Sequence, residues 1–275
     1  MDLKKFHNPN ISMPVIRRRV VEEMLELLGG IGEMAMTEGR SLLWHRYYKT
    51  KTPASYHSAI YRLKKAGLVI SCGKQRQHPI LSLTEKGKAQ IPAIYTPEKF
   101  WRKKWSGIWY VLIYDVPEKD RQYRDNLRGF LERMRMGCLQ KSVWVTPFDI
   151  RPEYDDLANA AAIQQYSYLL ESTTVLGRSA QDIVCSAWKY EALAEVQRWY
   201  CEVYNENIQR IIGSEVSEEM LLDLAREELS AYGVAMDGDP LLPSVLWPRE
   251  YYGEKVYALH QRITSEIAKR LTSLV

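Results

Sequence analysis

The sequence of 275 residues predicts an α+β fold divided among several domains. Three observations support this prediction. The first third has apolar residues at helical spacing, followed by two short strand-like runs. The middle has the pattern of a strand, a helix and a second strand. Long amphipathic helices dominate the last third. With 46% hydrophobic and 26% charged residues, the composition is that of a globular protein. It excludes a disordered chain, a collagen repeat or a disulfide scaffold as the main description.

Three helices are predicted in the first third of the chain. The first begins near Pro14 and ends at the paired glycines 29 and 30, with apolar residues at helical spacing between them. A shorter helix is predicted over about 41–48. The third, over about 53–66, has the clearest start, because Thr52 offers a capping hydroxyl directly before a proline at the first helical position.

The third predicted helix has two chemically distinct faces. A rotation of about 100° per residue turns Ile60 and Leu63 inward. The opposite face is small, hydroxylated, aromatic and basic, carries no acid, and consists of Ala54, Ser55, Ser58, Tyr61, Arg62 and Lys65. Such a face suits the major groove of DNA and its flanking phosphates. The simpler alternative is a solvated basic surface without a partner.

Two short apolar runs, 68–70 and 80–83, follow this helix and enclose a polar segment that contains Lys74 and Arg76. The pattern predicts a β-hairpin with a basic tip. Three helices followed by such a hairpin indicate a winged helix-turn-helix, in which the third helix enters the major groove and the wing touches the DNA backbone. Residues 83–87 resemble the closing segment common in bacterial regulators of this type.

The distribution of charge supports a nucleic-acid partner. The formal net charge is only +4, but residues 1–106 hold 20 Lys and Arg against 8 Asp and Glu, whereas residues 107–275 hold 18 against 26. A basic module joined to an acidic remainder is typical of a protein in which one part neutralises phosphates. We therefore predict a winged-helix DNA-binding domain over 1–95.

Seven side chains of this domain are predicted to contact DNA. The predicted contacts are Arg62 and Lys65 to base edges or phosphates, Ser55 and Ser58 to phosphates, Tyr61 from the same helix face, and Lys74 and Arg76 from the wing to the backbone. In a dimer, two such helices would lie in successive major grooves of a palindromic operator and block RNA polymerase sterically.

The middle of the chain predicts a ferredoxin-like domain over 105–178. Residues 108–114 form a continuous apolar run typical of a buried strand, residues 118–134 have helical spacing, and residues 138–146 predict a second strand. Strand, helix and strand make up half of a ferredoxin-like fold. A later strand is predicted around residues 175–176.

Residues 179–275 predict a helical domain. Amphipathic spacing extends over 188–212, continues in a helix that opens at residue 217, and returns over about 254–271. Aromatic residues are concentrated here. They are compatible with a dimer interface, with an effector pocket or with an ordinary core.

The middle and the end of the chain resemble one known family. The similar residues are Trp105 to Pro117, then Arg124, Leu127, Arg128 and Leu131, then Lys141 to Pro147, and near the end Asp239 to Pro243 with Trp247, Pro248 and Gly253. They look like the central region and the terminal signature of the PaaX-like repressors. The resemblance covers most of the chain in the same order, and a winged helix N-terminal to both segments is consistent with it.

The resemblance implies a homodimeric bacterial transcription repressor of a catabolic operon. Such a repressor binds double-stranded operator DNA and leaves it when an aryl coenzyme A thioester, such as phenylacetyl-CoA, binds as effector. A second possibility is a DNA-binding subunit that needs no small effector and acts through another protein.

An enzymatic alternative rests on Asp115. The central segment also resembles the small ferredoxin-like endoribonuclease subunit of CRISPR adaptation machinery, whose first strand ends in an acidic residue, here Asp115. Two such carboxylates facing each other in a dimer could hold Mg²⁺ and activate water for attack on a phosphodiester. The structural alternative is that Asp115 only caps the turn before Pro117.

The familiar enzyme motifs are absent from the sequence. It has no phosphate-binding loop, dinucleotide fingerprint, nucleophile elbow or zinc-helix motif, so we predict no catalytic residues, cofactor or metal. The four cysteines fit neither a disulfide framework nor a zinc site and are predicted to be buried free thiols. The longest apolar stretch has seven residues and no secretory signal is apparent, so we expect a cytoplasmic protein.

Overall fold

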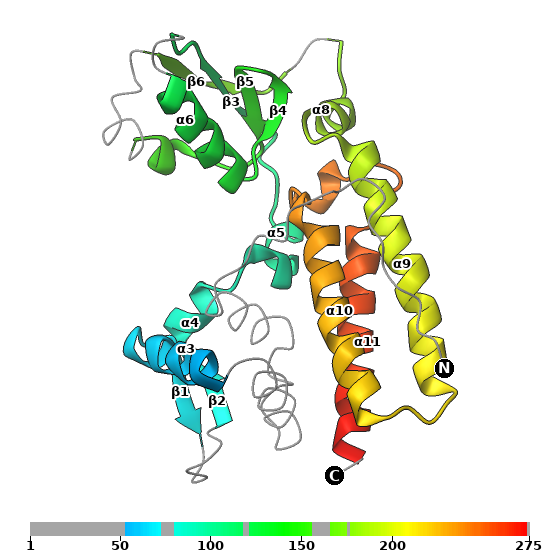
Figure 1. Ribbon diagram of the computed structural model, residues 1–275. Helices are drawn as coiled ribbons and strands as arrows, with labels where there is room; N and C mark the ends of the chain where they lie inside the picture. Colours follow the sequence, from blue (N-terminus) through cyan, green and yellow to red (C-terminus); the bar gives the residue numbers. More distant parts are fainter. Residues whose placement is uncertain (1–52, 73–79, 118–120, 156–165, 175–176, 274–275) are drawn as a thin grey trace. The chain divides into compact units, whose positions relative to one another are not determined.

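The computed structural model describes residues 53–72, 80–117, 121–155, 166–174 and 177–273 (Figure 1). The chain divides into two compact units. One groups 1–96 with 196–237 and 252–275, and the other groups 97–195 with 238–251. The division into three domains at 1–95, 105–178 and 179–275 stays a prediction. The two units group the segments differently, because part of the C-terminal region packs with the central sheet.

The described part of the N-terminal region begins with helix α3 (Pro53–Lys65) and continues into a hairpin of β1 (Val69–Cys72) and β2 (Ile80–Leu83). The two strands pair antiparallel, with Val69 opposite Leu83. Helix α4 (Glu85–Ala89) and the 3₁₀ turn η2 (Ala93–Tyr95) complete the segment. The third helix and both strands are present where the sequence predicts them. The first two predicted helices lie outside the described residues.

A four-stranded antiparallel sheet forms the centre of the second unit. Its strands are β3 (Trp109–Tyr114), β4 (Gly137–Gln140), β5 (Val143–Thr146) and β6 (Ser167–Ser172), in the spatial order β4-β5-β3-β6. Helix α6 (Arg121–Arg133) connects β3 to β4, and β5 lies between these two strands. This split arrangement is that of a ferredoxin-like sheet.

The sheet differs from the sequence prediction in two places. The stretch 138–146 is not one strand but a hairpin of β4 and β5, which turns at Lys141 and Ser142. Strand β6 lies at 167–172, where the sequence predicts none, and the strand predicted around residues 175–176 falls outside the described residues. Strand β6 was missed because it is an edge strand whose outward side chains do not produce a continuous apolar run.

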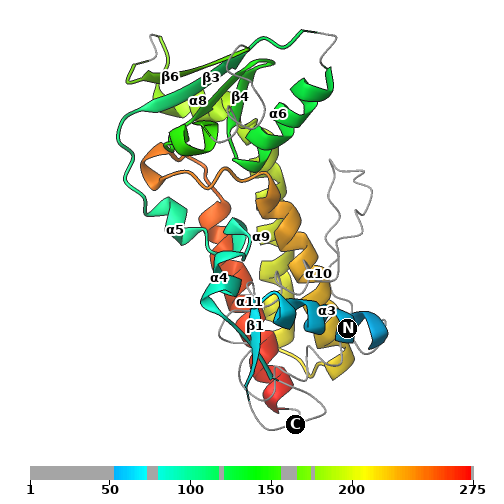
Figure 2. The same cartoon turned by 90° about the vertical axis from the view of Figure 1, so that its left-hand side faces the viewer.

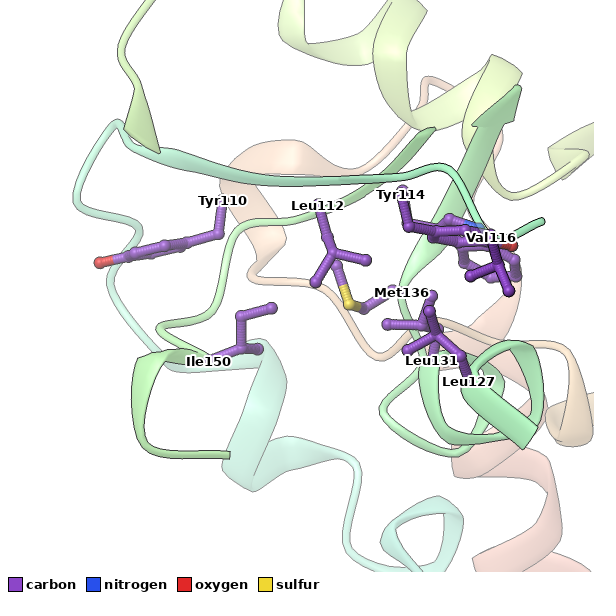
Figure 3. Close-up of a cluster of buried hydrophobic side chains, with 9 residues drawn as sticks. Tyr110, Leu112, Tyr114, Val116, Leu127, Leu131, Met136 and Ile150 are labelled. Carbon is purple, nitrogen blue, oxygen red and sulfur yellow. The ribbon is translucent and has the colours of Figure 1, made fainter. Parts of the chain in front are cut away.

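The core of the sheet domain follows from the alternation of side chains along β3. Tyr110, Leu112 and Tyr114 point to one face, where Tyr114 lies toward Leu127 and Leu131 of α6 and Tyr110 lies toward Ile150 (Figure 3). Trp109 points to the other face and packs with Ile183, Val184 and Ala187 of α8 (Ala180–Ala187), with Val145, and with Leu242 and Leu246 of the 238–251 segment. Both faces of the strand are thereby covered over part of their length.

Helices dominate the C-terminal region, as the sequence predicts. They are α9 (Tyr190–Ile212), α10 (Glu218–Asp237) and α11 (Gly253–Ser273), which run alongside one another over most of their length (Figures 1 and 2). Helix α8 was not predicted, although Ser179 and Asp182 form a capping box at its start. Among the described residues, no helix is long and apolar enough to cross a membrane.

Candidate nucleic-acid interface

The two faces of helix α3 lie as the sequence predicts. Leu63 is fully buried and Ile60 nearly so, whereas Tyr61 is 65% exposed. Arg62 and Lys65 are also exposed, and Ser58 is half-buried. Tyr61, Arg62 and Lys65 therefore share an accessible surface that no acidic residue of the helix interrupts.

Three of the predicted contacts receive no structural account. The side chain of Ser55 and the wing residues Lys74 and Arg76 lie outside the described residues. One basic residue of the helix was overlooked: Lys64 is exposed in the last turn of α3, beside Lys65. Basic side chains in that turn also interact favourably with the negative end of the helix dipole.

The C-terminus of α3 is fixed by a Schellman motif. The backbone N–H of Gly67 donates to the carbonyl of Lys64, and that of Leu68 donates to the carbonyl of Leu63, both at 2.9 Å. Gly67 adopts a φ of +70°, a conformation that favours glycine. Leu63 and Leu68 occupy the two positions between which this motif usually makes an apolar contact, and both are buried.

The closing segment 84–87 holds the same turn from the other side. The hydroxyl of Thr84 donates to the carbonyl of Gly67 at 2.7 Å, and the backbone N–H of Thr84 donates to that of Leu68 at 3.0 Å. The same hydroxyl accepts a bond from the N–H of Gly87 and so caps α4. The ammonium of Lys86 donates to the carbonyl of Ala66 at 2.9 Å. The carbonyls of the turn after α3, those of Ala66, Gly67 and Leu68, are thus satisfied by a segment that follows the hairpin.

Asp115, the residue of the enzymatic alternative, lies directly after β3 and is exposed. Its backbone N–H donates to the carbonyl of Tyr166 at 2.8 Å, which joins it to the strand on the sheet edge. Within the described ranges, no three His, Cys, Asp or Glu side chains come together as a set of metal ligands.

The comparisons with known proteins identify the sheet domain. Residues 102–184 match the family model of the PaaX protein central Cas2-like domain. Residues 102–184 are therefore similar to the central domain of PaaX proteins. The resemblance seen in the sequence is confirmed for this segment, including its likeness to the CRISPR adaptation subunit.

The chain shares its fold with a solved structure. It is the uncharacterized protein Rv0674 from Mycobacterium tuberculosis, which is 17% identical with a TM-score of 0.56, over 93% of this chain and 97% of that one. At this identity the likeness concerns the fold alone. No curated protein matches the chain.

The C-terminal segment 238–251, part of which resembles a family signature in sequence, has a structural role here. Asp239 is completely buried, and its carboxylate accepts bonds from the hydroxyl of Tyr251 at 2.9 Å and from the backbone N–H of Leu241 at 2.8 Å. Arg135, in the loop before β4, donates to the Asp239 carbonyl. Burial, together with the charge of Asp239, raises the pKa of Tyr251 well above its usual range. Asp239 thus fastens the 238–251 segment to the central sheet domain.

An aromatic cluster completes this attachment. Trp101 of α5 (Glu98–Trp101) makes edge contacts with Trp247 and Tyr251, at centroid distances of 5.6 and 6.0 Å. Trp247 packs against Tyr251 at 4.4 Å and donates from Nε1 to the carbonyl of Leu242. Core packing therefore accounts for these aromatic residues.

The cysteines are only partly as predicted. Cys138, Cys185 and Cys201 are free thiols, but only Cys201 is buried, and Cys185 is exposed. Burial raises the pKa of the Cys201 thiol to about 11. The prediction of burial is wrong for Cys185 because that residue lies on the outward side of the short helix α8. The side chain of Cys72 lies outside the described residues.

Proposed function

We propose that the protein is a DNA-binding transcriptional regulator that acts as a homodimeric repressor of a catabolic operon in the cytoplasm. The observation that carries the proposal is the accessible acid-free surface of α3. The central PaaX-like domain supports it, because PaaX-like proteins are regulators. The winged helix-turn-helix belongs to this proposal, with α3 as the helix that enters the major groove.

The contacts with DNA follow from the chemistry of the exposed side chains. Arg62 and Lys65 would neutralise phosphates or read base edges, and Lys64 would add a third cation near the helix end. Tyr61 offers a ring and a hydroxyl beside them. Ser55, Ser58, Lys74 and Arg76 remain predicted contacts to the DNA backbone.

The test replaces the two central cations of this surface. Arg62→Ala with Lys65→Ala weakens binding to DNA from the flanking intergenic region in a gel-shift assay at fixed salt, while the circular dichroism spectrum is retained. The matched control is Lys141→Ala, which removes an exposed cation from the turn between β4 and β5. Wild-type affinity in the double variant would rule out α3 as the DNA-binding element.

The dimer is proposed to form through the part of the sheet face that the described helices leave exposed. Tyr168 is 70% exposed and Leu170 is 48% exposed, and both belong to the edge strand β6. They lie opposite Ile113 and Val111 of β3, so these apolar side chains share one face. A second copy of the chain would cover this patch in an isologous contact.

Oligomeric state tests this surface directly. Tyr168→Lys with Leu170→Lys shifts the sedimentation coefficient from that of a dimer to that of a monomer. Val245→Lys is the control, since Val245 is an equally exposed apolar residue (61%) on the 3₁₀ turn η5 (Ser244–Leu246). A double variant that stays dimeric would place the interface elsewhere.

The effector of the proposed repressor is an aryl coenzyme A thioester. This part of the proposal rests on the family resemblance alone. Titration calorimetry with phenylacetyl-CoA, with free coenzyme A as control, tests it. Binding of the thioester that also releases DNA supports the assignment. Release of DNA by no member of a panel of acyl-CoA esters would favour a regulator that acts through another protein.

The alternative function is a metal-dependent phosphodiesterase, and the observation that favours it is the exposed Asp115 at the end of β3 in a Cas2-like domain. Incubation with labelled RNA and DNA in the presence of Mg²⁺ or Mn²⁺ separates the two functions. Cleavage that is lost in Asp115→Asn would establish the enzyme. If the protein is a regulator, it leaves the labelled RNA and DNA intact, and wild type and Asp115→Asn bind DNA equally well.

A further inference from the structure

A buried polar cluster lies among the C-terminal helices. Glu228 of α10 is completely buried, and its Oε1 accepts a hydrogen bond from the hydroxyl of Tyr200 of α9 at 2.5 Å. The Nδ1 atom of His260 of α11 lies 2.7 Å from the same oxygen. His260 is 1% exposed. One carboxylate oxygen therefore connects all three helices.

The cluster continues to the turn η2, at the end of the N-terminal module, by which we mean the described residues from α3 to η2. The ring of Tyr232 stacks on the imidazole of His260, with centroids 3.9 Å apart and planes at 17°. The hydroxyl of Tyr232 donates to the carbonyl of Ile94 in η2 at 2.5 Å. Tyr95 lies beside both rings, with centroids 5.5 Å from Tyr232 and 6.2 Å from His260. The turn η2 follows α4 by only three residues.

Burying this polar cluster costs folding free energy, which suggests that its fixed geometry has a purpose. A buried carboxylate loses its hydration, and the second oxygen of Glu228, Oε2, has no hydrogen-bond partner among the described residues. Apolar side chains of similar size would fill the same space without that cost. A polar cluster is satisfied in one arrangement of its elements only, so it fixes which surfaces meet more strictly than apolar packing does.

We propose that Tyr232 and His260 are positioning residues for the DNA-binding module, through which the C-terminal helices hold η2 and thereby set the DNA affinity of α3. The proposal rests on the proposed function for its effect on DNA and on the geometry alone for its effect on η2. Glu228 and Tyr200 orient the imidazole, the imidazole supports the Tyr232 ring, and the Tyr232 hydroxyl holds Ile94. Any change that shifts α10 against α11 would be transmitted along this series of contacts.

The test uses the full chain and two conservative variants. Tyr232→Phe removes only the hydroxyl that binds Ile94, and His260→Gln retains a hydrogen-bond donor for Glu228 but removes the stacked ring. We expect amide exchange of residues 91–96 to rise about five- to tenfold in Tyr232→Phe, the change that corresponds to the loss of one buried hydrogen bond. We expect DNA affinity to fall by a similar factor in both variants.

Tyr204→Phe is the matched control. Tyr204 is equally buried and its ring packs on Tyr200 at 4.7 Å, but no bond joins it to η2 among the described residues. It reports the cost of removing a buried hydroxyl from the same helices. If amide exchange at 91–96 is unchanged in Tyr232→Phe, the Tyr232 hydroxyl does not hold η2 and the proposal is overturned. Equal loss of DNA affinity in Tyr204→Phe and Tyr232→Phe would show a general loss of stability instead.

The two proposals fail in distinguishable ways. If the wild-type chain binds no DNA, the proposed function fails, and amide exchange at 91–96 still decides whether Tyr232 holds η2. If exchange rises but DNA affinity is unchanged, the contact exists without the regulatory role. Both results are obtained from the same four proteins.

Discussion

Gly87 lies directly against the backbone of Leu68: a Cβ atom at position 87 would stand 2.0 Å from the Leu68 carbonyl oxygen. That oxygen cannot easily move away, because it also accepts bonds from the backbone N–H and from the hydroxyl of Thr84. The close approach explains why a glycine ends the segment Leu83 to Gly87. It also places the start of α4 against the turn that closes α3.

The first prediction follows from this contact. Gly87→Ala destabilises the N-terminal module by about 1–3 kcal/mol, because the methyl group forces the backbone apart. DNA affinity falls with it, since the end of α3 moves. Limited proteolysis of the first hundred residues measures the effect. The control is Gly129→Ala in α6, where the nearest atom would be the end of the Arg133 side chain at 3.5 Å. A module that resists protease equally in both variants would contradict the prediction.

Local periodicity explains how much of this fold the sequence reveals. Helix α3, strand β3 and the long C-terminal helices have apolar spacing that a short window captures, and each is present near its predicted bounds. The sequence does not predict the hairpin of β4 and β5, because its turn, Lys141-Ser142, contains none of the glycine, asparagine or aspartate that usually marks a two-residue turn.

Contacts between residues that are far apart in the chain cannot be predicted from such local periodicity. Glu228 and His260 are 32 positions apart, and Arg135 and Asp239 are 104 apart, so only the tertiary fold brings either pair together. Each of these residues looks like an ordinary surface charge in the sequence. The sequence left the C-terminal aromatic residues open between a dimer interface, an effector pocket and a core, and the structure packs two of them, Trp247 and Tyr251, against Trp101.

The second prediction concerns the attachment of the 238–251 segment. Asp239→Ala leaves the hydroxyl of Tyr251 and the backbone N–H of Leu241 without their buried acceptor. The unfolding free energy of the unit that groups 97–195 with 238–251 falls by about 3 kcal/mol, because hydrogen bonds to a charged group are lost and their donors stay buried. Urea denaturation followed by tryptophan fluorescence measures the change. Tyr251→Phe removes one donor only and should cost about half as much. A larger loss for Tyr251→Phe than for Asp239→Ala would contradict the prediction that the Asp239 carboxylate holds the segment.

The third prediction is a pH dependence at the start of α8. Bonds from the backbone N–H and the hydroxyl of Ser179 hold the pKa of Asp182 below its usual range. A lowered folded-state pKa means that the carboxylate stabilises the fold above the unfolded-state value of about 3.9 and loses this effect as the pH falls through the folded-state value. The difference in melting temperature between wild type and Asp182→Ala is therefore largest at neutral pH and shrinks on acidification. Asp155→Ala, at another exposed carboxylate, serves as the control. A difference that grows on acidification would have the wrong sign for this cap.

The fourth prediction connects the charge of α3 to the salt dependence of DNA binding. A repressor dimer that makes about 6–10 phosphate contacts loses roughly a thousandfold or more in affinity between 50 and 200 mM salt. Each phosphate contact contributes about 0.9 to the slope of log affinity against log salt concentration.

Arg62→Ala and Lys65→Ala each remove two contacts from a dimer if both side chains bind phosphates, so the double variant lowers the slope by about 3 to 4. Fluorescence anisotropy over a salt series measures it, with Lys141→Ala as the control. If Arg62 instead reads a base edge, its removal weakens binding chiefly to the operator. In that case affinity for random DNA is nearly kept. A wild-type slope together with wild-type discrimination between the two DNAs would mean that neither side chain touches DNA, and the exposed cations of α3 would then be a solvated surface.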